Sequence, residues 1–218
     1  MNNFSKKLKN TYNNFYSKGM WNMGGGSRSG LGSSIEYTRS YSENLINIIK
    51  DYNTNKVFDC SCGDWFWMND IKDNFKYYVG NDVCEKLILE NKKKFESNSI
   101  KFVSDDMLSQ MKTFNNYEFD LSICRHTFEH LPTDYNIECI FQMKRISRYA
   151  LITTSNHGKN VDIEIDFDNY VGLSRGVNLD EDPYVNILPL PTLKFWDTAI
   201  ENQNESNVGT FGYLYKFD

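Results

Sequence analysis

Short apolar segments alternate with amphipathic segments through the middle of the chain, and this alternation constrains the fold more than any other feature. The segments expected to form strands are 56–60, 77–82, 100–106, 119–124 and 149–154. Those expected to form helices are 35–52, 85–95 and 136–147, and a further helix could open at 65–71. Strands that alternate with helices form a parallel sheet with right-handed crossovers. We therefore predict an α/β fold with a Rossmann-like, mostly parallel sheet flanked by helices, which strands near residues 195–196 and 213–217 complete.

The length of 218 residues suits a single domain over 1–218. Five of the 13 glycines fall between Gly24 and Gly32, next to Trp21. Such a segment forms either a flexible linker or a loop whose bare backbone closes over a ligand. The neighbouring tryptophan favours the second, so we predict a glycine-rich cap segment at about 18–40. A second irregular segment, at about 158–192, is expected to form an insert on the substrate side.

The composition limits location and partners. With a formal net charge of −5, the chain is a poor candidate for contacts with nucleic-acid phosphates. It has no apolar run near the ~20 residues of a membrane helix, and no apolar signal sequence at its start. Its five cysteines are odd in number, which favours reduced thiols in the cytoplasm. Cys60 and Cys62 lack a second ligand pair, so we expect no metal site.

Acidic residues follow three of the predicted strands. Asp59 and Asp64 lie in the turn after the first strand, Asp82 ends the second, and Asp105 and Asp106 end the third. Because the carboxyl ends of parallel strands meet at one edge, these acids are expected to share a ligand site.

The spacing of these acids indicates a nucleoside. Asp82 comes about 20 residues after the first turn, where an acid accepts hydrogen bonds from a ribose diol. The turn itself holds only one glycine, Gly63, and Asp64 would repel a phosphate at this position. The pattern favours a cationic ligand such as an adenosine with a sulfonium and an amino group.

Four motifs then resemble those of class I S-adenosylmethionine-dependent methyltransferases, in the same order. They are Val57-Phe-Asp-Cys-Ser-Cys-Gly-Asp-Trp65, Tyr78-Val-Gly-Asn-Asp82, Phe102-Val-Ser-Asp-Asp-Met107 and Asp120-Leu-Ser-Ile-Cys-Arg-His-Thr-Phe-Glu-His-Leu-Pro132. The preceding Trp21-Asn-Met-Gly-Gly-Gly-Ser27 segment is similar to a subfamily associated with bacterial capsule and viral glycan biosynthesis. This resemblance implies a methyltransferase that uses S-adenosylmethionine and methylates a small polar acceptor, a sugar, nucleotide-sugar or glycan, at an oxygen.

The resemblance also implies roles for individual residues. Those expected to bind the cofactor are Asp59, Ser61, Gly63, Asp82, Asp106, Met107 and Arg125. His126 is the first candidate for the general base and His130 the second, because an imidazole titrates near neutral pH. Those expected to bind the substrate are Trp21, Ser27, Trp65, His157, Tyr170 and Arg175. No nucleic acid or membrane is expected as a partner, and a homodimer stays open.

Three other functions agree less well with the sequence. An NAD-dependent sugar oxidoreductase needs a glycine-rich pyrophosphate turn, which this chain lacks. A non-catalytic binding protein of the same fold is disfavoured by the acids at three strand ends, although Ser61, where the family usually has glycine, leaves it open. A nucleic-acid methyltransferase is disfavoured by the acidic charge and by the absence of an N/D-P-P-Y/F motif after the fourth strand.

Overall fold

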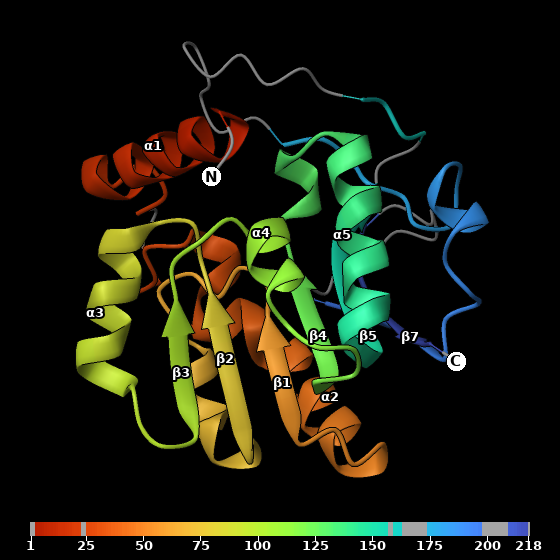
Figure 1. Ribbon diagram of the computed structural model, residues 1–218, viewed down its shortest axis with the longest axis horizontal. Helices are drawn as coiled ribbons and strands as arrows, with labels where there is room; N and C mark the ends of the chain where they lie inside the picture. The colour runs from red at the N-terminus through yellow and green to blue at the C-terminus, as the bar shows by residue number, and fades with distance from the viewer. Residues whose placement is uncertain (1–2, 23–24, 157–158, 163–173, 198–208, 218) are drawn as a thin grey trace.

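The computed structural model describes residues 3–22, 25–156, 159–162, 174–197 and 209–217, and their strands form one sheet in the order β3-β2-β1-β4-β5-β7-β6 (Figure 1). The strands are β1 (Lys56–Asp59), β2 (Tyr77–Asn81), β3 (Ile100–Val103), β4 (Phe119–Arg125), β5 (Ser147–Asn156), β6 (Leu193–Trp196) and β7 (Gly209–Lys216). Strands β1 to β5 pair in parallel, and β7 pairs antiparallel with both β5 and β6. The prediction of a mostly parallel α/β sheet is confirmed.

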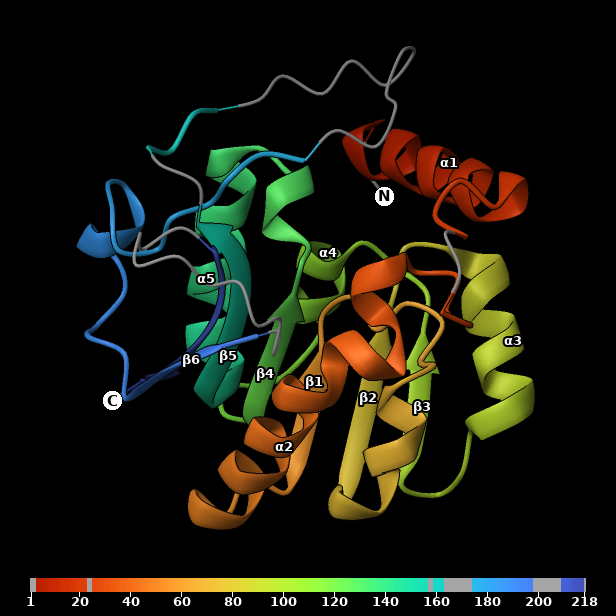
Figure 2. The same ribbon diagram turned by 180° about the vertical axis from the view of Figure 1, so that it is seen from behind.

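Helices cover both faces of this sheet. They are α1 (Asn3–Lys18), α2 (Ile35–Asp51), α3 (Glu85–Phe95), α4 (Met107–Lys112) and α5 (Thr133–Ile146), with short 3-10 helices η1 (Leu31–Ser33), η2 (Met68–Asn74), η3 (Phe128–His130) and η4 (Tyr184–Asn186). Helices α4 and α5 lie over one face, and α2 lies over the other (Figures 1 and 2). Successive strand residues therefore enter different cores: Phe58 packs under α5, whereas Val57 packs under α2.

Helix α1 lies across the carboxyl edge of the sheet and not against a face (Figure 1). Leu8 on its underside joins the core, and Lys9 pairs with Glu85 of α3 at 2.7 Å. The first helix thus forms a roof over the strand ends. None of the helices within the described residues is both long and apolar enough to cross a lipid bilayer.

Two local expectations differ from the structure. A helix was predicted to open at Trp65, but the first helical turn here is η2, which begins at Met68. Trp65 has a φ of 56°, a left-handed conformation that no residue of a right-handed helix adopts. Helix α2 begins at Ile35, capped by the hydroxyl of Ser34, so 35–40 belong to a helix and not to the cap segment.

Candidate functional site

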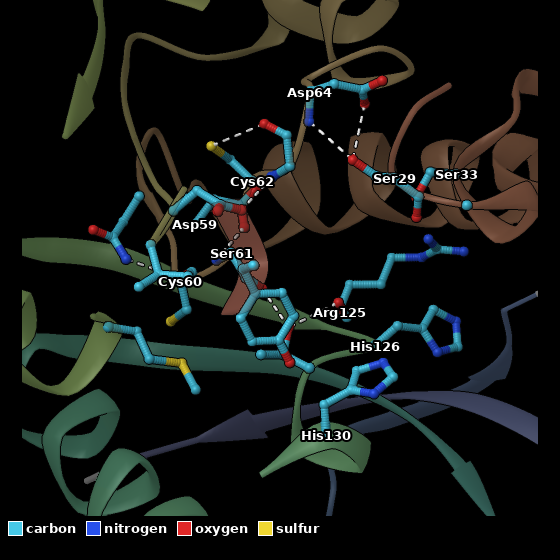
Figure 3. A pocket seen from close by; sticks show the side chains of 18 of the residues that line it. Ser29, Ser33, Asp59, Cys60, Ser61, Cys62, Asp64, Arg125, His126 and His130 are labelled. Carbon is cyan, nitrogen blue, oxygen red and sulfur yellow. Dashed lines mark hydrogen bonds between the residues drawn. The ribbon is translucent and has the colours of Figure 1, made fainter. Parts of the chain in front are cut away.

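A cavity of about 350 Å³ opens at the carboxyl edge of the sheet, between the ends of β1, β2 and β4 and the roof formed by α1. The carboxylates that follow three strands, Asp59, Asp82 and Asp106, all line it. Figure 3 shows the turn after β1 on one side and the residues after β4 on the other. Asp59, Asp82 and Asp106 thus share one cavity, as the sequence predicted, whereas Asp105 does not line it.

The side chain of Asp82 binds the turn after β1. Its Oδ2 accepts the backbone N–H of Gly63 at 3.1 Å, and its Oδ1 accepts that of Cys84 at 2.8 Å. Each carboxylate oxygen can accept two hydrogen bonds, so one position on each oxygen remains for a ligand. Two such positions on one carboxylate match the two hydroxyls of a ribose.

Gly63 cannot be exchanged for a larger residue in this turn. Its φ is 57°, and a Cβ added there would lie 2.5 Å from the Oγ of Ser29. Only glycine adopts such a conformation without strain and also admits the close approach of a neighbouring hydroxyl. The glycine that the sequence singled out is thus required by the backbone geometry of the turn.

Asp59 accepts the hydroxyl of Tyr78 at 2.7 Å and the backbone N–H of Ser61 at 3.3 Å. Burial raises the pKa of Asp59 to about 6 even though these two donors favour the charged form. Burial likewise raises the pKa of Asp82 to about 6 against the N–H groups of Cys84 and Gly63. Two carboxylates that are costly to ionise in the free protein suit a ligand that carries a positive charge or several donors.

Asp106 differs from the other two acids because protein donors already hold most of its acceptor positions. It caps α4 by accepting the N–H of Ser109 at 3.1 Å, and it accepts the hydroxyls of Tyr135 and Ser5, each at 2.7 Å. Burial works toward a higher pKa, but the donors outweigh it and hold the pKa of Asp106 below its ordinary value. The side chain of Ser109 contributes most to this lowering, ahead of the hydroxyls of Ser5 and Tyr135.

The glycine-rich loop is fastened to Asp64. The carboxylate accepts the hydroxyls of Ser27 and Ser29 at 3.1 to 3.2 Å and the backbone N–H of Arg28 at 2.6 Å. Figure 3 shows its contacts with Ser29. The hydroxyls of Ser29 and Tyr16 lie 2.9 Å apart, which ties the loop to α1. Asp64 therefore anchors the loop over the cavity.

The turn after β4 forms the opposite wall. Arg125 donates through Nε and Nη2 to the two oxygens of Asp197, at 2.8 and 2.7 Å, and its guanidinium lies over the ring of Tyr41. His126 lies with Nδ1 3.1 Å from Glu129 and Nε2 3.2 Å from Asp197. Further along, the ring of His130 packs beside that of Trp21, with centroids 6.1 Å apart.

A sequence model described as a methyltransferase domain matches residues 58–148, the segment that supplies these strand ends. The chain therefore contains a methyltransferase domain, and S-adenosylmethionine is its cofactor. This match favours a methyltransferase over the oxidoreductase.

Solved structures share the fold of this methyltransferase at low sequence identity. The methyltransferase domain of bacterial CtHen1-C is 14% identical and has a TM-score of 0.62, with 84% of this chain and 99% of that chain covered. The PH0226 protein from Pyrococcus horikoshii OT3 is 18% identical, with a TM-score of 0.59 and coverages of 83% and 91%. The N-methyltransferase NodS from Bradyrhizobium japonicum WM9 is 11% identical, with a TM-score of 0.57 and coverages of 82% and 95%. No curated protein matches the sequence.

The cavity of this methyltransferase offers carboxylate acceptors for the donor groups of its cofactor. All seven residues expected to bind the cofactor line it: Asp59, Ser61, Gly63, Asp82, Asp106, Met107 and Arg125. The hydroxyl of Ser61 points across the cavity floor to that of Thr127, with which it forms a hydrogen bond. Arg125 is expected to meet the cofactor through its backbone, because Asp197 already holds its guanidinium.

His126 does not fit the role of general base that the sequence suggested. Burial and the nearby Arg125 favour the neutral ring, but the hydrogen bonds with Asp197 and Glu129 outweigh them and raise the pKa of His126 to about 9. At neutral pH both ring nitrogens then carry protons and donate to carboxylates. Such a ring has no lone pair with which to accept a proton from a substrate.

Three of the residues expected to bind the substrate lie elsewhere. Ser27 is fully buried beneath the loop, where it donates to Asp64. Trp65 is also fully buried and packs against the rings of the core. Arg175 does not line the cavity, because it donates to the carbonyl oxygens of Leu131 and Val161.

Of the other expected substrate residues, Trp21 lines the cavity, whereas His157 and Tyr170 lie outside the described residues. The predicted insert at 158–192 is described only at 159–162 and 174–192, and there η4 is its one helical turn.

The sequence analysis missed Asp197. Because β7 runs against both β5 and β6, the end of β6 reaches the same edge as the ends of β1 to β5. An acid directly after a strand was the signal used for Asp59 and Asp82. The same signal at Phe195-Trp196-Asp197 would have found this carboxylate if the direction of β6 had been known.

Proposed function

We propose that this methyltransferase transfers the methyl group to an oxygen of a small polar acceptor, a sugar, nucleotide-sugar or glycan. The observation that carries the proposal is the combination of an acidic cofactor pocket with an aromatic wall at one cavity. Tyr12, Tyr16 and Trp21 supply that wall from α1 and the segment after it. Aromatic faces suit the apolar faces of sugar rings, whereas the carboxylates around the cavity disfavour a nucleic-acid backbone.

The cofactor-binding roles follow from the free acceptor positions. Asp82 binds the ribose hydroxyls, Asp59 and the turn at Ser61 and Gly63 receive the methionine part, and Asp106 accepts the adenine amino group beside Met107. The cofactor supplies an activated methyl group on a sulfonium, whose sulfide leaves as the acceptor oxygen attacks. The protein aligns the acceptor with this methyl group and excludes water beneath α1.

His130 is the general base that accepts the proton of the acceptor hydroxyl. His130 lines the cavity next to Trp21, on the wall where an acceptor stacked on the indole would lie. His126, its only rival among the candidates, has both nitrogens engaged by acids. A base within reach of the acceptor contributes typically ~100-fold or more to the rate.

The test of this function is a transfer assay with methyl-labelled S-adenosylmethionine and a panel of sugars, nucleotide-sugars, an RNA oligonucleotide and a peptide. Methylation of a sugar oxygen, located by NMR of the product, is expected. Transfer only to RNA, to a peptide or to a nitrogen would contradict the proposal.

With the acceptor found, His130→Ala is expected to lower kcat by about 100-fold, because the hydroxyl loses its base. The affinity for S-adenosylmethionine is expected to stay the same, since His130 is given no part in holding the cofactor. Asp180→Asn is the control, because Asp180 contacts Lys194 and Tyr213 away from the cavity lining. An unchanged kcat in His130→Ala would show that His130 is not the general base.

Cofactor binding is expected to strengthen as the pH rises through about 6. The pKa of Asp59 and that of Asp82 are raised to about 6, so both acids prefer the protonated form below that pH, whereas a cofactor that donates hydrogen bonds binds the ionised form. Each acid that must ionise lowers the affinity by about tenfold between pH 7 and pH 5. Calorimetry with S-adenosylhomocysteine across this range measures the effect, and in Asp82→Asn the dependence should become shallower. A flat profile in the wild type would contradict the assignment of both acids.

A further inference from the structure

Asp197 is a buried carboxylate at the edge of the cavity for which cofactor binding gives no reason. It follows β6, where its backbone N–H donates to the carbonyl of Thr210 at 3.0 Å, and its side chain is 0% exposed. Its two oxygens accept Arg125 at 2.8 and 2.7 Å, and one of them lies 3.2 Å from His126. A fixed acid from the far strand of the sheet thus reaches both residues at the start of the turn after β4.

The imidazole of His126 is held from its other side as well. Glu129 places Oε1 3.1 Å from Nδ1 of His126, and the same oxygen accepts the backbone N–H of Ser155 at 2.9 Å. Each acid that binds the ring is therefore itself anchored to the sheet, Asp197 to β7 and Glu129 to β5. The ring cannot rotate without losing one of the two contacts.

The backbone of His126 needs such support. Its φ is 52°, a left-handed conformation that is strained for a residue other than glycine. A strained residue persists only where its surroundings fix it. Here the backbone N–H of His126 donates to the carbonyl of Thr153 at 3.0 Å, and the two carboxylates fix the side chain.

The strained turn at His126 connects directly to the cofactor pocket. Thr127, the next residue, donates to the carbonyl of Arg125 at 3.1 Å and shares a hydrogen bond with the hydroxyl of Ser61. Ser61 lies in the turn between Asp59 and Gly63. A continuous set of contacts thus joins Asp197, through His126 and Thr127, to the floor of the cofactor pocket.

We propose that Asp197 is a positioning residue for the cofactor: with Glu129 it clamps the His126 side chain, and the clamped turn holds Thr127 against Ser61. Strand β6 then contributes to cofactor affinity without touching the cofactor. A buried ion pair by itself is weak evidence for a role in stability, since such pairs often contribute little. What favours a positioning role is that both acids converge on one strained residue of the pocket wall.

The charge on His126 decides whether its ring stays bound to both carboxylates, Asp197 and Glu129. The groups that face it are Arg125 on β4, Glu129 on η3 and Asp197 after β6, with Tyr41 of α2 packed on Arg125. Both carboxylates are bound most strongly by the charged ring, whose pKa of about 9 keeps it protonated at neutral pH. Without one carboxylate, the pKa of His126 falls toward its ordinary value near 6.5, so the clamp opens between pH 6 and pH 8.

The experiment compares Asp197→Asn with the wild type by calorimetry with S-adenosylhomocysteine at pH 6 and pH 8. The ratio of the two dissociation constants is expected to be about tenfold at pH 8 and clearly smaller at pH 6, where the ring is still charged and stays bound to Glu129. Glu129→Gln is expected to act in the same direction, and Asp180→Asn to leave the ratio at one at both values. The chain has only three histidines, so NMR of the imidazole protons can follow His126 directly.

Several outcomes would overturn the proposal. A loss of affinity that is equal at both pH values would indicate a merely structural role, and an unchanged affinity would indicate none. A His126 that titrates near 6.5 in the wild type would show that no clamp exists, and this measurement needs no variant. If Asp197→Asn does not fold, Glu129→Gln is judged by the same ratios.

Discussion

Replacing Asp82 with alanine is expected to weaken S-adenosylmethionine binding by at least about 100-fold. The variant loses a carboxylate with two open acceptor positions, and hydrogen bonds to a charged group contribute about 1.5 to 3 kcal/mol each. It also leaves the N–H groups of Gly63 and Cys84 without their acceptor, which loosens the turn. Since 1.4 kcal/mol corresponds to a factor of ten, a loss of about 3 kcal/mol gives the expected change. Calorimetry with the cofactor measures it.

The chain offers a matched control at the opposite edge of the sheet. Asp120 also accepts two backbone N–H groups, those of Asn55 and Lys56, at 3.0 and 2.9 Å, but it does not line the cavity. Asp120→Ala is therefore expected to lower stability without changing cofactor affinity. Equal effects of Asp82→Ala and Asp120→Ala on binding would show that loss of fold, and not loss of a ligand, explains the result.

Replacing Trp65 with alanine is expected to lower the free energy of unfolding by about 3 to 5 kcal/mol, the usual cost of removing a large aromatic side chain from a core. Trp65 is 0% exposed, and its ring centroid lies 5.1 Å from that of Phe95 and 5.2 Å from that of Phe102. Denaturant unfolding followed by circular dichroism measures the change.

Trp21→Ala is the comparison for this prediction. Trp21 is only partly buried and lines the cavity, so its loss is expected to cost about 1 kcal/mol of stability and to weaken acceptor binding. A Trp65→Ala protein as stable as the wild type would contradict the assignment of Trp65 to the core.

The residues proposed to bind the cofactor could be predicted from the sequence, because short-range patterns show where each strand ends. A buried strand followed by an acid or a glycine turn predicts where Asp59, Gly63 and Asp82 lie, since all parallel strands end at one edge. The position of Asp106 followed from the same rule. No knowledge of side-chain contacts was needed to bring these residues together.

The roles of the remaining residues depend on contacts between segments far apart in the chain. The family resemblance implied that Trp65 binds the substrate, but its left-handed backbone directs the ring into the core. His126 looked like a base because of its place after β4, but Asp197, 71 positions later, and Glu129 together raise its pKa to about 9. Burial and through-space charge decide such roles, and neither can be read from spacing.

The sequence by itself determined the mostly parallel sheet and the acids that gather around the cavity at its carboxyl edge, because strand and turn preferences are local. Only the tertiary structure decided that two acids hold the ring of His126, what anchors the glycine-rich loop, and that β6 returns to the same edge to place Asp197. These features depend on hydrogen bonds between residues that lie 35 to 72 positions apart in the sequence. The energy of such bonds depends on distance and burial, which exist only once the chain has folded.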